Sequence, residues 1–287
     1  MDEPLWCYRH PSRETRVTCS ECGRPICEEC MTFAPVGIRC PEHAGAGAAR
    51  PSAARTVRQA RGRVAGLEAP ATVALVIANV LVYLITVAQG PGGLRPGGEL
   101  YTKGALFIAY PFAPDQGLAN GEWWRLVTAA FLHGSVIHLA FNMFALFWLG
   151  SIVEQALGTT RYLLVYFASG LAGSAGALVM DPNAITVGAS GAIYGIFGSL
   201  LILEWKATGR IAGPALTLIV LNLALTFAIP NVSIGGHVGG LIGGVLATLA
   251  LTQTRRLSGA ALVGPALVLA VGVVSVAIAY FRVESYL

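Results

Sequence analysis

Residues 234–252 read IGGHVGGLIGGVLATLALT, an apolar run long enough to cross a bilayer that carries one histidine and six glycines. The glycines form two rows at four-residue intervals, Gly235, Gly239 and Gly243, and Gly236, Gly240 and Gly244. Small residues at this spacing let two helix backbones approach closely. A similar row, Gly191, Gly195 and Ser199, follows Ser190. If these faces meet, Ser190 and His237 come within hydrogen-bond reach.

Apolar stretches of similar length recur through most of the chain. We predict seven spans, at residues 70–88, 137–154, 161–180, 188–206, 213–230, 234–252 and 260–281. The 287 residues are 55% hydrophobic and only 12% charged, about half the charge of a soluble domain. The composition therefore excludes a single soluble enzyme and predicts an all-α polytopic membrane protein.

The N-terminal residues have a different composition, because all six cysteines lie between residues 7 and 40. Together with two histidines they form four chelating pairs, Cys7-x2-His10, Cys19-x2-Cys22, Cys27-x2-Cys30 and Cys40-x2-His43. Eight ligands suffice for two tetrahedral zinc ions and leave no open position for catalysis. Disulfides are the alternative, but they leave the spacing of the two histidines unexplained. We predict a double zinc-binding domain at residues 1–45, and the spacing leaves open which pairs share an ion.

An arginine-rich segment at residues 46–69 is expected to be a flexible basic linker. Thiolate ligands require a reducing compartment, and basic residues of short loops favour the cytoplasmic side. The loops at Arg161, at 206–210 and at 255–256 then lie on the same side as the linker. We expect a cytoplasmic N-terminus, an external C-terminus, and an external loop at 89–136 with Trp123, Trp124 and Arg125 at the lipid interface. The net charge of +4 is too small to suggest a nucleic-acid partner.

Few polar side chains occur within the spans, so each is a functional candidate. The second span opens with His133, His138 and Asn142, of which the last two share a helical face. Ser190 lies in the first turn of the fourth span, where free backbone N–H groups and the helix dipole favour an anion. Together with His237 these residues fall at one depth and suit acyl transfer. Taken singly they have other interpretations, such as packing for Ser190 or a metal or proton relay for His237. A transporter would require broken helices or an intramembrane carboxylate, which the sequence does not suggest.

Four motifs together are specific: Trp124-Arg125, His133-x4-His138-x3-Asn142, Gly188-x-Ser190-Gly191 followed by Tyr194, and Gly236-His237-x-Gly239. With these motifs residues 70–252 resemble the rhomboid family of intramembrane serine proteases. The resemblance implies a six-helix core, which residues 253–287 extend by a seventh helix.

The resemblance also implies roles. Ser190 would be the nucleophile and His237 the general base, in a dyad with no catalytic cofactor, and Tyr194 would stack on His237. His138, Asn142 and the Ser190 backbone N–H would form the oxyanion hole, supported by Gly188, Gly191, His133, Trp124 and Arg125. Substrates would be transmembrane proteins, met in the lipid bilayer of a bacterial plasma membrane with the active site opening externally. The alternative is a catalytically silent relative that binds membrane helices. The cysteine-rich domain resembles B-box-type zinc fingers, which implies pairing of first with third and second with fourth pairs, and docking of a cytoplasmic partner.

Overall fold

The computed structural model describes residues 5–33, 37–43, 69–109, 114–254 and 260–287. The chain divides into two compact units, residues 1–64 and 65–287. Apart from Ala69, the expected basic linker lies outside the described residues, and so do Arg255 and Arg256.

The N-terminal unit is built from two short antiparallel hairpins. Strand β1 (Leu5–Cys7) pairs with β2 (His10–Thr15), and β3 (Thr32–Phe33) pairs with β4 (Ile38–Arg39). Its buried core consists of Ile26 and five of the six cysteines. So little apolar surface cannot hold a domain of this size together without a further constraint.

The second unit is a bundle of helices, and all seven predicted spans are helical. Their bounds are α2 Pro70–Ala88, α5 to α6 Val136–Leu157, α7 Thr159–Met180, α8 Ser190–Thr208, α9 Pro214–Ala228, α10 Ile234–Gln253 and α11 Ala260–Glu284. The second span combines α5 (Val136–Ala145), a π-helical turn η3 (Leu146–Gly150) and α6 (Ser151–Leu157). Five of these helices are long and apolar enough to cross a membrane. Of the other two, α8 contains Glu204 and Lys206, and α9 is only 15 residues long. The fold is that of an all-α polytopic membrane protein.

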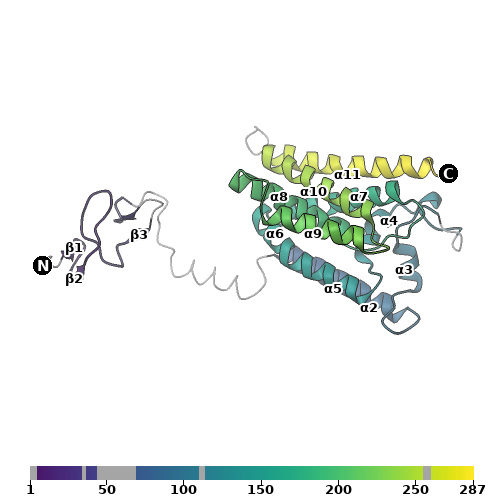
Figure 1. Cartoon of the computed structure of the whole chain (residues 1–287), viewed down its shortest axis with the longest axis horizontal. Coiled ribbons are helices and arrows are strands. Elements are labelled where there is room, and N and C mark those ends of the chain that lie inside the picture. The colour runs from purple at the N-terminus through teal and green to yellow at the C-terminus, as the bar shows by residue number, and fades with distance from the viewer. Residues whose placement is uncertain (1–4, 34–36, 44–68, 110–113, 255–259) are drawn as a thin grey trace. The chain divides into compact units, whose positions relative to one another are not determined.

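Helix α10 packs against both α7 and α8, and α11 runs beside α7 and α10 (Figure 1). The two glycine rows of α10 serve different neighbours. A Cβ atom at Gly235 would lie 2.1 Å from the carbonyl oxygen of Gly176 on α7, and one at Gly240 would lie 1.9 Å from the Gly191 oxygen on α8. The sequence predicted the contact with α8 alone. The second row is needed because α10 is enclosed on two sides.

Two glutamates, the buried Glu154 and the half-buried Glu204, accept hydrogen bonds from the N-termini of neighbouring helices. The carboxylate of Glu154, in the first turn of α6, accepts hydrogen bonds from the backbone N–H groups of Ala71 and Thr72 at the start of α2. Glu204, near the end of α8, accepts one from the Ala215 N–H at the start of α9. The N-cap residues of α2 and α9 make no side-chain capping hydrogen bond. The glutamates therefore supply the missing acceptors and a favourable charge at the helix N-termini.

The segment between α2 and α5 contains the short helices α3 (Gly98–Gly104), η1 (Leu118–Asn120), α4 (Arg125–Thr128) and η2 (Ala129–Phe131). Figure 1 shows α3 and α4 at the end of the bundle where α11 finishes. The aromatic rings of Trp123 and Tyr280 in α11 lie 5.8 Å apart, which ties this segment to the seventh helix.

The expectation that Arg125 lies at the lipid interface is wrong, because its side chain is completely buried. The guanidinium donates hydrogen bonds to the carbonyl oxygens of Thr102 and Ala105, and to the Glu122 carboxylate at 2.5 Å. It also lies over the Phe107 ring, 4.4 Å from the centroid. The last carbonyl groups of a helix have no partner within it, and this arginine supplies donors to those at the end of α3. Neighbouring Trp124 is half exposed.

Candidate active site

Ser190 is the first residue of α8 and is held by an unusual backbone turn before it. Gly188 has φ +128°, a conformation that favours glycine, and a Cβ atom there would lie 2.7 Å from the His138 ring and 3.7 Å from the Asn142 amide nitrogen. The glycine therefore lets the α5 side chains His138 and Asn142 approach the turn that carries Ser190. The predicted start of the span at residue 188 is two residues early.

His237 lies in the first turn of α10 and points its ring at Ser190. Its Nε2 atom is 2.9 Å from Ser190 Oγ, so the hydrogen-bond reach predicted from the glycine rows is confirmed. Tyr194, one turn below Ser190, stacks on the imidazole with ring centroids 4.0 Å apart and an interplanar angle of 16°. The Ser233 hydroxyl caps α10 by accepting a hydrogen bond from the Gly236 N–H. The ring is thereby fixed between two helices in a buried position.

The other nitrogen of His237 has a partner that sequence reasoning missed. Nδ1 lies 2.7 Å from the hydroxyl oxygen of Thr226, and the Tyr194 hydroxyl lies 2.6 Å from the same oxygen. Thr226 is a buried residue of α9. The sequence contains little signal for it, because several threonines occur in the apolar helices and most bond their own helix backbone.

His138 and Asn142 lie one turn apart on α5, facing the Gly188 turn. The Asn142 amide nitrogen is buried and has no hydrogen-bond partner. A buried donor without an acceptor is costly, so such a group in a native structure calls for an explanation. A transient oxyanion beside the start of α8 is an acceptor of the right kind.

His133 is placed differently from the expectation that it opens the second span, because it precedes α5, which begins at Val136. Its ring is completely buried, and neither ring nitrogen has a hydrogen-bond partner. It packs edge-on against the His138 ring with centroids 5.0 Å apart. His133 therefore contributes to the position of His138 through packing.

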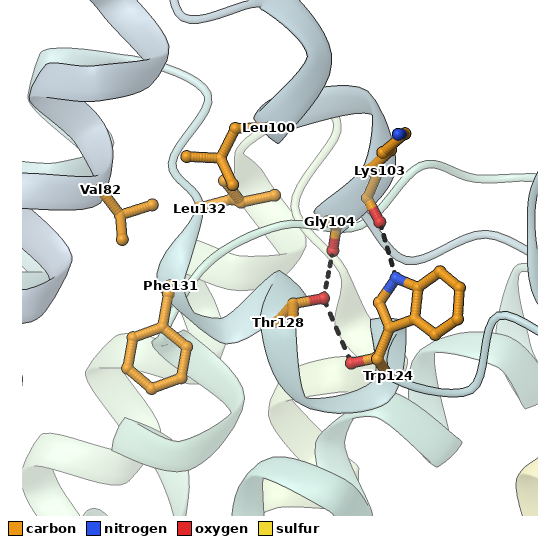
Figure 2. Close-up of a pocket in the computed structure, with 8 residues that line it drawn as sticks. All are labelled: Val82, Leu100, Lys103, Gly104, Trp124, Thr128, Phe131 and Leu132. Carbon is orange, nitrogen blue, oxygen red and sulfur yellow. Dashed lines mark hydrogen bonds between the residues drawn. The ribbon is translucent and has the colours of Figure 1, made fainter.

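A separate apolar cavity of about 370 Å³ lies between α2 and the segment that follows it (Figure 2). In it the Trp124 indole donates to the Lys103 carbonyl and the Thr128 hydroxyl donates to the Gly104 carbonyl. Among the described residues that line this cavity, neither Ser190 nor His237 occurs. Trp124 thus joins α4 to α3, and its indole N–H bonds to the Lys103 carbonyl, not to Ser190.

The N-terminal unit contains two clusters of metal-ligating side chains, Cys7, His10, Cys27 and Cys30, and Cys19, Cys22, Cys40 and His43. In the first, His10 Nδ1 lies 3.3 Å from Cys27 Sγ and 3.4 Å from Cys30 Sγ. In the second, Cys22 Sγ lies 3.7 Å from Cys40 Sγ. Within each set all ligand atoms lie within 4.8 Å of one another, and three thiols with one imidazole are a donor set that tetrahedral zinc accepts.

The grouping joins the first pair with the third and the second with the fourth, as the zinc-finger resemblance implies. All six cysteines are free thiols. Burial raises the pKa of the Cys30 and Cys40 thiols to about 11, so these groups stay protonated at neutral pH unless a cation displaces the proton.

Comparison with known proteins gives one consistent result. A rhomboid domain matches residues 120–254. The chain is similar to the rhomboid protease GluP of Bacillus subtilis, at 41% identity over 159 residues that make up 54% of this chain and 31% of GluP. It is also similar to the putative rhomboid protease YdcA of Bacillus subtilis, at 38% identity over 49% of this chain and 73% of YdcA. A rhomboid-like protease 3 of Toxoplasma gondii is 28% identical over 60% of this chain and 65% of that protein.

Proposed function

Because this chain belongs to the rhomboid family, an intramembrane protease family, we propose that it is a serine endopeptidase in which Ser190 is the nucleophile and His237 the general base. The observation that carries the proposal is the 2.9 Å approach of His237 Nε2 to Ser190 Oγ. A serine is a weak nucleophile unless a base in hydrogen-bond contact removes its proton. A carboxylate beside the histidine would place a buried charge within the membrane, which is costly, so we propose a dyad in place of a triad.

In the first half of the reaction Ser190 Oγ attacks the peptide carbonyl while its proton passes to His237 Nε2. The tetrahedral oxyanion would accept hydrogen bonds from the Ser190 backbone N–H, the Asn142 amide and the His138 ring, assisted by the dipole of α8. The C–N bond then breaks, and the histidine returns the proton to the leaving amine. Water, deprotonated by His237, hydrolyses the acyl-enzyme and restores Ser190.

Substrates are transmembrane segments of other membrane proteins. Ser190 and His237 each occupy the first turn of a helix, and these two helix starts define one end of the bundle. A peptide bond must leave helical geometry before it can be attacked, so small or helix-destabilising residues near that end of a substrate helix favour cleavage. We place this end on the external face of a bacterial plasma membrane and the N-terminal unit in the cytoplasm, on the thiol chemistry and basic-loop arguments above.

The test compares purified wild type, Ser190→Ala and Ser199→Ala in proteoliposomes that contain a model transmembrane substrate. Ser199 is the control serine of the same helix: its hydroxyl donates to the Gly195 carbonyl and accepts from Thr248 of α10, and it makes no hydrogen bond to Ser190 or His237 in the described structure. We expect wild type and Ser199→Ala to cleave and Ser190→Ala to be inactive. Equal cleavage by Ser190→Ala would refute the proposal, and binding without cleavage by wild type would favour a silent helix-binding protein.

For residues 1–45 we propose a B-box-like domain that holds two structural zinc ions and docks a cytoplasmic partner. The support is the two sets of three cysteines and one histidine, each with ligand atoms within 4.8 Å of one another. Elemental analysis of the full chain should give two zinc equivalents for wild type and about one for Cys27→Ser/Cys30→Ser. Absence of zinc from the wild type would contradict the assignment.

A further inference from the structure

The Thr226 hydroxyl group has three polar neighbours and only one proton. Its oxygen lies 2.9 Å from the backbone carbonyl of Asn222, 2.7 Å from His237 Nδ1 and 2.6 Å from the Tyr194 hydroxyl. A carbonyl oxygen can only accept, whereas a hydroxyl can both donate and accept. The threonine therefore donates its proton to Asn222, four residues earlier on α9.

That donation determines what the other two contacts must be. With its proton committed to Asn222, the Thr226 oxygen can only accept from His237 and Tyr194. His237 Nδ1 must then carry a hydrogen, because two lone pairs 2.7 Å apart would repel. In the reverse arrangement Thr226 would donate to Nδ1, and its oxygen would lie 2.9 Å from the Asn222 oxygen with no proton between them.

A neutral imidazole has one N–H, so a proton on Nδ1 leaves the lone pair on Nε2. Nε2 is the atom 2.9 Å from Ser190 Oγ. The network thus selects the tautomer in which the ring can accept the serine proton. The opposite tautomer would present an N–H to the serine and could not act as its base.

We propose that Thr226 is a positioning residue that fixes the tautomer and the orientation of His237, a place that a buried carboxylate occupies in other serine hydrolases. The inference rests on the proposed function, since it assigns a role toward the Ser190 and His237 pair. Thr226 touches neither the substrate nor the serine and acts only through the imidazole. When the ring becomes an imidazolium during the reaction, its hydrogen bond to the neutral hydroxyl strengthens without requiring a buried anion.

Tyr194 participates in the same network with both parts of its side chain. Its ring covers the imidazole face. Its hydroxyl donates a hydrogen bond to the Thr226 oxygen, which also accepts one from the Nδ1–H group of His237. The side chains from α8, α9 and α10 are therefore joined at one oxygen atom. Displacement of α9 relative to α10 would release the ring of His237.

The experiment combines 15N NMR of histidine-labelled full-length protein with cleavage kinetics on a model transmembrane substrate. Thr226→Val removes the acceptor at nearly constant shape, and Thr226→Ser restores the hydroxyl. Thr217→Val is the matched control, because Thr217 lies on the same helix, is exposed and bonds only to the Gly213 carbonyl in the described structure.

In wild type we expect the His237 proton on Nδ1. Thr226→Val should move it toward Nε2 and lower kcat about tenfold to a hundredfold with little change in KM, the effect of losing a hydrogen bond to a group that becomes charged. Thr226→Ser should restore both readouts, and Thr217→Val should alter neither.

A wild-type proton on Nε2 would overturn the inference whether or not any variant folds. An unchanged tautomer and kcat in Thr226→Val would also overturn it while leaving the proposed protease intact. Absence of cleavage by wild type would refute the proposed function alone, because the NMR measurement does not depend on activity.

Discussion

Gly240→Ala is expected to separate the two helices that bear Ser190 and His237. Gly240 lies one turn after His237 on α10, and a Cβ atom there would lie 1.9 Å from the carbonyl oxygen of Gly191, the residue after Ser190. The obstacle is backbone at the start of a helix, which cannot rotate away as a side chain can. The strain must therefore be relieved by movement of α10 relative to α8.

The size of that movement follows from the contact distance. Real Cβ atoms essentially never approach within 3.0 Å of such an atom, so the gap must open by at least about 1.1 Å, the difference between 3.0 Å and 1.9 Å. If the helices move as rigid bodies, the hydrogen bond of 2.9 Å between His237 and Ser190 lengthens to about 4 Å and is lost. A displacement of about 1 Å at a reacting pair can lower the rate about a hundredfold. Overpacking of this kind also lowers the free energy of unfolding by about 1–3 kcal/mol.

The assay measures kcat for a model transmembrane substrate in proteoliposomes, with thermal unfolding as the check on folding. Gly170→Ala is the matched control, because its Cβ would meet only Ala192 of α8, at an ordinary 3.7 Å. We expect about a hundredfold loss for Gly240→Ala and wild-type activity for Gly170→Ala. A Gly240→Ala enzyme that folds and cleaves at the wild-type rate would refute the argument that close helix contact sets the site geometry.

Three further predictions concern other parts of the molecule. Arg125→Met should destabilise the bundle by about 2–5 kcal/mol, because the carbonyl oxygens of Thr102 and Ala105 would lose their donor and the partly buried Glu122 its cation. A Tm equal to wild type would contradict this. Burial alone would raise the pKa of Glu122, but hydrogen bonds from the Gly117 N–H and from Arg125 outweigh it and hold this pKa below its ordinary 4.5. The ionised carboxylate therefore stabilises the fold above pH 4.5, and this stabilisation is lost as the pH falls through the lowered pKa. Glu122→Gln should lower Tm at pH 7 and lose its difference from wild type well below pH 4.5, and a pH-independent difference would count against the assignment. A zinc chelator should make residues 5–43 sensitive to protease, because bound zinc supplies about 10 kcal/mol or more of folding free energy in small zinc domains. Continued resistance to protease would exclude a structural metal.

The seven helices were predictable from the sequence because bilayer thickness sets their length, and each lies within a few residues of its expected range. The packing was only partly predictable. Four-residue spacing of glycines indicates close contact but does not say with which helix, and the row at Gly235 contacts α7. The burial of Arg125 could not be predicted, since its carbonyl partners lie at the C-terminal end of α3, a short helix in a segment with no periodic signal.

Within the candidate site, Ser190 and His237 stood out because polar side chains are scarce in the spans, and the structure brings them into contact. Thr226 was overlooked for the opposite reason. Threonines that bond their own helix backbone are common, and Thr226 does this too, through Asn222. Only the three-dimensional arrangement shows that its oxygen also contacts Tyr194 and His237.

The central claim, that His237 activates Ser190, is tested most directly by reaction with a serine-directed fluorophosphonate followed by mass spectrometry of the labelled peptide. We predict a single adduct on Ser190 in wild type and in Ser199→Ala, and none in Ser190→Ala or His237→Ala. Labelling of His237→Ala at the wild-type rate, or an adduct on another residue, would contradict the account.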